Sequence, residues 1–88
     1  TKEEAKFEIE RRRIEATLLK YGRRGFKYSE GNAYMYYNHE EQEITIVNES
    51  YSQKQGTIYF DTYHLCEQAI KATGEDNIKK YIFGVYDE

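Results

Sequence analysis

Seven basic residues between positions 11 and 27 are the side chains of this chain best suited to chemistry, and that chemistry is anion binding. They are Arg11, Arg12, Arg13, Lys20, Arg23, Arg24 and Lys27, and the one acid among them is Glu15. Cations at this density can follow a phosphate backbone while neighbouring aromatic rings stack on bases. They can also pair with acids of the same chain, or meet an acidic protein partner.

The charge of the remaining chain favours a protein partner. Residues 28–78 carry nine acids and two lysines, so the net charge of -3 combines a basic segment with an acidic, tyrosine-rich body. An acidic body repels a polyanion at short range. We therefore expect the seven cations, together with Tyr34 and Tyr36, to contact a protein. Nucleic-acid binding through the basic segment is the alternative, and pairing within the chain is the third interpretation.

Catalysis is not indicated by any set of residues. His64 and Cys66 are too few and too poorly spaced for a metal site, which needs three or four converging ligands. Cys66 lacks a visible base that could make it a nucleophile. Glu40, Glu41 and Glu43 crowd a predicted turn, where they are solvated rather than held apart in a cleft. The sequence predicts no catalytic residue, no metal and no cofactor, and hence a protein that is not an enzyme.

The basic segment begins on a predicted helix over residues 2–21, which has strong helix formers and neither glycine nor proline. Phe7, Ile14 and Tyr21 recur every seven positions, and Leu18 fills the site between the last two. This stripe predicts a helix that projects from the domain or pairs with a second copy, giving a homodimer. Gly22 is a natural end for the helix.

Strand patterns follow in residues 32–38, 43–48 and 56–61, with a polar turn near Asn38. Asp61 or Thr62 starts a second helix that ends at Gly74, and residues 81–85 alternate as a last strand. The order α-β-β-β-α-β predicts an α+β fold: a largely antiparallel sheet of three or four strands with one helix packed on it. The predicted core is Ile44, Ile46, Ile58, Phe60, Leu65, Ala69, Ile70 and Phe83.

The length of 88 residues indicates a single domain, in which residues 1–27 form a charged helix and loop and residues 28–88 the sheet module. One cysteine excludes an internal disulfide, and no apolar run is long enough to cross a membrane. We expect a cytoplasmic protein without membrane contact.

The second half of the chain resembles a module at the C-terminus of small phage and prophage proteins of low-GC Gram-positive bacteria. The resemblance lies in the segments G-T-I-Y-F-D-T (56–62), A-I (69–70), G-E (74–75) and I-K-K-Y-I-F-G-V (78–85), preceded by the aromatic run 34–37. It implies a phage-type accessory protein in the cytoplasm of a bacterial host. Such proteins often bind a host protein and redirect or block it, and some inhibit defence nucleases, as anti-CRISPR proteins do. No site residue follows from this resemblance.

Overall fold

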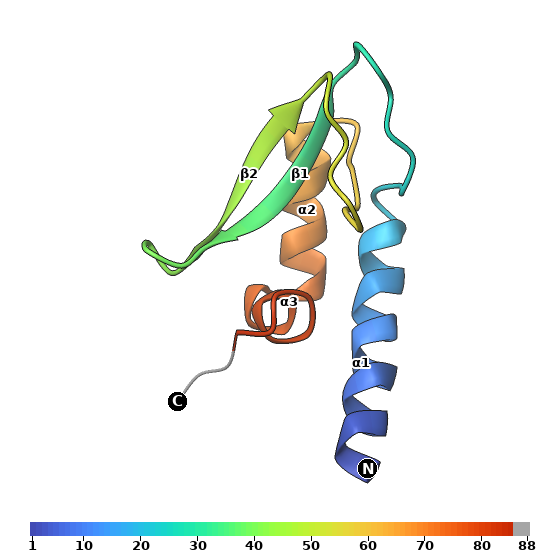
Figure 1. Ribbon diagram of the computed structural model, residues 1–88, viewed down its shortest axis with the longest axis vertical. Helices are drawn as coiled ribbons and strands as arrows, with labels where there is room; N and C mark the ends of the chain where they lie inside the picture. Colours follow the sequence, from blue (N-terminus) through green and yellow to red (C-terminus); the bar gives the residue numbers. More distant parts are fainter. Residues whose placement is uncertain (86–88) are drawn as a thin grey trace.

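A computed structural model describes residues 1–85. Its elements are helix α1 (Lys2–Leu19), strands β1 (Asn32–Asn38) and β2 (Glu43–Glu49), and helices α2 (Tyr63–Thr73) and α3 (Glu75–Tyr81). The protein is therefore α+β, as predicted, but its order is α-β-β-α-α. Figure 1 shows α1 running alongside α2, with the β1–β2 hairpin on the other side of α2 and α3 crossing below the sheet.

Helix α1 confirms the helix predicted over residues 2–21. The side chain of Thr1 caps it by accepting a 3.1 Å hydrogen bond from the backbone N–H of Glu4. Glu3 and Glu4 occupy the first turn, where negative charge favours the helix dipole. The helix was expected to project or to dimerise, but it packs against α2 and α3 of its own chain.

The hairpin confirms the first two predicted strands. β1 and β2 are antiparallel, with Met35 opposite Ile46 and Tyr37 opposite Ile44. The turn forms because the side-chain oxygen of Asn38 accepts hydrogen bonds from the backbone N–H groups of Glu40 and Glu41, at 2.9 and 3.0 Å. Two strands complete this sheet, so the prediction of three or four is not confirmed.

The predicted third strand, residues 56–61, is reduced to two bridging residues. Tyr59 exchanges two 2.7 Å backbone hydrogen bonds with Arg23, and Phe60 pairs with Ala33 on its other side. Both side chains are fully buried. The segment is therefore a short insert between the 23–27 loop and the start of β1. Its pairing holds the loop against the sheet.

Helix α2 begins and ends as predicted. The hydroxyl of Thr62 accepts from the backbone N–H of Leu65 at 3.0 Å, and Gly74 ends the helix with a φ of 96°, which a residue with a side chain rarely adopts. The strand predicted over residues 81–85 is wrong. A new helix, α3, starts directly after Gly74 and ends at Tyr81, and residues 82–85 follow it without pairing in the described sheet.

The core lies where α1, α2 and α3 meet the inner face of the hairpin. Phe60 and Ala69 are buried as predicted, while Ile44, Ile46, Ile58, Leu65, Ile70 and Phe83 are partly buried and pack against this core. Its other buried members are Ile14, Leu18, Ala33, Cys66 and Ile78. Among residues 1–85, no helix combines the length and apolar character that crossing a membrane requires.

Candidate functional site

Arg11, Glu15 and Arg24 form a charged cluster at the side of α1. The guanidinium of Arg11 pairs with Glu15 one turn later and with Glu8 one turn earlier, the latter at 2.9 Å. Arg24, on the loop after the helix, reaches back to the other oxygen of Glu15. The hydrogen bond from Arg11 lowers the pKa of Glu8, and the same bond raises the pKa of Arg11.

Arg23 and Lys27 form a second cluster around Asp61. Each places a nitrogen 3.3 Å from the same carboxylate oxygen, and Arg23 also donates a 2.7 Å hydrogen bond to the side chain of Asn32. Because the backbone of Arg23 pairs with Tyr59, this arginine is held at both its main chain and its side chain. It secures the loop against the sheet rather than facing a ligand.

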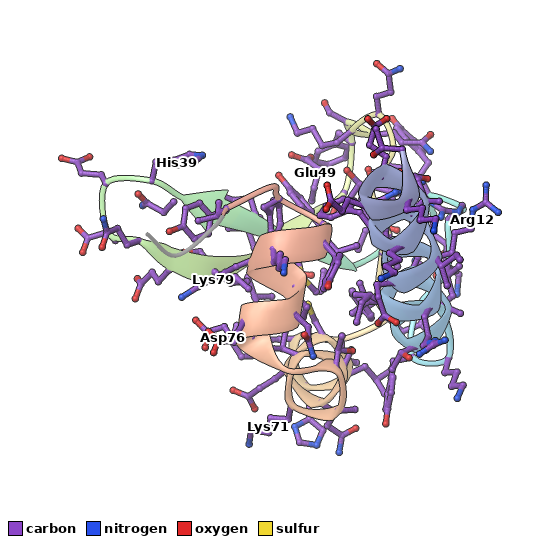
Figure 2. The ribbon with its side chains drawn as sticks, turned by 90° about the horizontal axis from the view of Figure 1, so that it is seen from below. Arg12, His39, Glu49, Lys71, Asp76 and Lys79 are labelled. Atoms are coloured by element: carbon purple, nitrogen blue, oxygen red, sulfur yellow. The ribbon has the colours of Figure 1, made fainter. Side chains whose placement is uncertain are left out.

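The remaining cations lie on the exposed side of α1. Arg13 pairs with Glu10 at 3.0 Å, while Arg12 and Lys20 are exposed and form no ion pair within residues 1–85. Figure 2 shows Arg12 pointing away from the ribbon. Five of the seven predicted anion-binding cations are thus paired with acids of the same chain. The pairing interpretation therefore describes most of the basic segment.

Tyr34 and Tyr36 lie on the outer face of the hairpin, but in different surroundings. The ring of Tyr34 is partly buried and meets the ring of Tyr59 edge to face, with centroids 5.9 Å apart. Tyr36, nearer the tip, is 39% exposed. Tyr34 therefore helps to pack the insert, while Tyr36 remains accessible to a partner.

The residues of the predicted dimer stripe are covered within the chain. Ile14 and Leu18 are buried in the core, Tyr21 packs against it, and the ring of Phe7 lies 5.0 Å from the ring of Tyr81. The stripe correctly predicted an apolar face on the helix. This face packs against α2 and α3 of the same chain rather than against a second copy. The prediction of a homodimer thus loses the basis on which it was made.

A groove opens between α1 and the segments that pack beside it. Its volume is about 450 Å³. Leu18, Met35, Ile58, Ile82 and Phe83 give it an apolar floor, and Tyr81 and residues 55–57 complete its walls. The first charged cluster, with Arg11, Glu15 and Arg24, forms its rim. We call this the central groove. Sequence reasoning missed it because its residues come from α1, β1, the end of α3 and three loop segments far apart in the chain.

Besides the central groove, sequence reasoning also missed the role of Asn32. Its side chain is fully buried at the start of β1 and makes five hydrogen bonds. The amide nitrogen donates to the carbonyls of Lys27, Glu30 and Glu49, and the oxygen accepts from Lys27 and Arg23. A lone asparagine before an aromatic strand gives no signal of this role. It positions the loop that carries Arg24 to the groove.

The candidate reactive groups are not assembled into a site. Cys66 is buried, and desolvation raises the pKa of its thiol to about 12, so the nucleophilic thiolate is suppressed at neutral pH. His39 stacks edge to face on Tyr37 at the hairpin tip, and His64 lies 3.9 Å from Glu67. Within residues 1–85, no three histidine, cysteine or acidic side chains are grouped to hold a metal ion.

Comparisons of the chain with protein-family models, with curated proteins and with solved structures find no match.

Proposed function

We propose that this protein is a non-enzymatic accessory protein that acts by binding another protein, and that the central groove receives the partner. The observation that carries this proposal is the groove itself, which joins an apolar floor to a charged rim. Pockets of a few hundred Å³ with this composition bind side chains or small ligands. The apolar floor gains free energy by excluding water, and the rim selects the orientation of the partner.

The rim suits a partner that carries a carboxylate beside an apolar side chain. Arg24 is 52% exposed and shares Glu15 with Arg11, whereas Arg11 also pairs with Glu8. Arg24 has no acidic partner of its own within residues 1–85, so a carboxylate of the partner at the mouth of the groove could accept hydrogen bonds from its guanidinium. The apolar neighbour of that carboxylate would occupy the floor formed by Leu18, Ile58 and Phe83.

The resemblance to phage proteins favours a bacterial host protein as the partner, and inhibition of a defence nuclease is one outcome of such binding. This part of the proposal rests on the resemblance and on no residue of the groove. Nothing in the geometry favours the alternative, a nucleic-acid-binding regulator, because five of the seven cations already have acidic partners.

The test compares two charge reversals in the capture of proteins from a bacterial lysate. Arg24→Glu alters the rim, whereas Arg12→Glu makes the same change of charge at an exposed site on α1. We expect Arg24→Glu to weaken capture of a stoichiometric protein by about tenfold or more, and Arg12→Glu by less than about twofold. Capture should survive nuclease treatment. Equal losses in both variants would remove the groove from the proposal, and loss on nuclease treatment would support nucleic-acid binding.

A further inference from the structure

The hairpin of residues 32–49 carries negative charge that the rest of the chain does not balance. It contains Glu40, Glu41, Glu43 and Glu49 and neither lysine nor arginine. None of the four forms an ion pair within residues 1–85. Glu49 is used locally, since its carboxylate accepts hydrogen bonds from three backbone N–H groups of residues 50–52. The uncompensated charge is therefore concentrated at the tip, on Glu40, Glu41 and Glu43.

No other strand of residues 1–85 pairs with the outer edge of β2. β2 pairs with β1 alone in the described sheet, and Figure 1 shows it as the outermost strand. Ala33 of β1 directs its N–H and C=O away from β2, because both bond to Phe60. Ala33 and its partner Asn48 are therefore a non-hydrogen-bonded pair, and Asn48 directs its backbone N–H and C=O away from β1. Every second residue of a strand has the same orientation, so the backbone groups of Ile46 and Ile44 also point to the outer edge of β2. Among residues 1–85, the backbone N–H and C=O groups that these three residues direct to this edge have no hydrogen-bond partner.

A second copy of the chain fits this edge poorly. A symmetric antiparallel pairing of two β2 strands about Ile46 would place each Glu43 opposite a Glu49 of the other copy. Like charges directly opposite each other in a sheet are destabilising. The same acids attract a strand of the opposite charge. The composition of the edge therefore discriminates against the chain itself and in favour of a basic partner.

We propose that the β2 edge binds an extended segment of a partner protein by adding a strand, and that this segment carries basic residues beside the hairpin tip. An antiparallel strand has its C-terminal end next to Glu43. The matching segment thus alternates apolar and small residues and ends in lysines or arginines. Its backbone bonds to Ile44, Ile46 and Asn48, and its apolar side chains extend the face formed by Met35 and Ile46. Ile44, Ile46 and Asn48 do not line the central groove, although Met35 borders both surfaces.

The probe is a synthetic peptide of alternating valine and threonine followed by lysines, titrated into the protein and followed by backbone NMR. We expect the largest amide shifts at Ile44, Ile46 and Asn48, together with slower hydrogen exchange there. Two control peptides isolate the contributions. One is N-methylated at the residues that face the edge, which removes the backbone bonds, and the other has its lysines at the N-terminal end. Each should bind at least about fivefold more weakly.

Matched variants of the protein complete the test. Glu40→Gln with Glu41→Gln removes two tip charges, and Glu3→Gln with Glu30→Gln removes two charges outside the hairpin. The tip variant should weaken peptide binding by about threefold to tenfold at low salt, and the other pair by less than about twofold.

Equal binding of the N-methylated peptide would overturn strand addition. Protection of the edge amides by raising the protein concentration alone would show a second copy as the occupant and overturn the proposal. Arg24→Glu should leave peptide binding unchanged, which separates this result from that of the groove.

Discussion

Asn32 holds three segments of the chain together through one side chain. Truncating this side chain should therefore lower the free energy of unfolding by a large amount for the few atoms removed. Its amide donors face the carbonyls of Lys27, Glu30 and Glu49, and its oxygen accepts from Arg23 and from the backbone of Lys27. All of these bonds lie in or beside a fully buried position. A buried polar group that loses its partner loses the bond and cannot recover it from water.

We therefore predict that Asn32→Ala lowers the free energy of unfolding by about 3 kcal/mol. Asn32→Asp should cost at least as much at neutral pH, since a carboxylate would face three carbonyl oxygens without donors. Urea denaturation followed by circular dichroism measures both, and Asn48→Ala, at an exposed site of the same hairpin, serves as the control. A loss below about 0.5 kcal/mol for Asn32→Ala would mean that the loop does not depend on this network.

Cys66 gives the stability of the protein a defined dependence on alkaline pH. Burial raises the pKa of its thiol from 9.0 to about 12, so above pH 9 the unfolded chain releases this proton while the folded chain keeps it. The folded state then binds more protons than the unfolded state, and stability falls as pH rises. The contribution of Cys66 is fully present below pH 9 and is lost between pH 9 and 12.

The corresponding prediction compares the chain with its Cys66→Ala variant, which shares every other titrating group. Between pH 9 and pH 10.5, the free energy of unfolding of the unmodified chain should fall more than that of the variant, by about 1 kcal/mol per pH unit. Urea denaturation at a series of pH values gives the difference. Parallel pH profiles for the two proteins would show that the thiol titrates normally in the fold.

At the scale of the elements, local signals in the sequence predicted α2 and β2 well. The cap at Thr62, the stop at Gly74 and the alternation of Ile44 and Ile46 specified α2 and β2 from residues close in sequence. Helix α3 carries such signals too. Glu75 and Asp76 lie in its first turn and Lys79 and Lys80 in its last, which suits the helix dipole. The alternation of Tyr81, Phe83 and Val85 predicts a strand instead, although Ile78, Tyr81 and Ile82 have the spacing of a helix face.

The insert at Tyr59 and Phe60 was beyond local reasoning because two distant segments decide its length. Gly22 lies against it so closely that a Cβ there would be 2.5 Å from the carbonyl oxygen of Tyr59 and 2.8 Å from the ring of Phe60. The sequence identified Gly22 as a helix stop, but its second role depends on this approach. The central groove was missed for the same reason, since its lining combines α1, β1, residues 55–58 and residues 81–83.

At the scale of the whole molecule, the charge asymmetry of the sequence is rearranged by folding. The basic segment that dominates the sequence is largely neutralised, because Glu15 serves Arg11 and Arg24 while Asp61 serves Arg23 and Lys27. The acids of the hairpin tip stay exposed. Within the basic segment, the cations that form no ion pair in residues 1–85 are Arg12 and Lys20. Too few phosphates could then be neutralised to give strong binding, because each contact adds one released counterion.

We accordingly predict no measurable binding of the protein to random-sequence duplex DNA at 150 mM salt, in contrast to the micromolar affinity that about six phosphate contacts can give. Glu15→Gln with Asp61→Asn is the informative variant, because it releases Arg23, Arg24 and Lys27 from their acidic partners, leaves Arg11 paired with Glu8 alone, and keeps the basic residues intact. This variant should bind DNA detectably at low salt. The logarithm of its binding constant should fall linearly with the logarithm of the salt concentration, with a slope of about -0.9 for each phosphate contacted. Fluorescence anisotropy at several salt concentrations measures both proteins. Micromolar binding by the unmodified chain at 150 mM salt would show that the ion pairs open to admit phosphates, and the basic segment would then be a nucleic-acid surface.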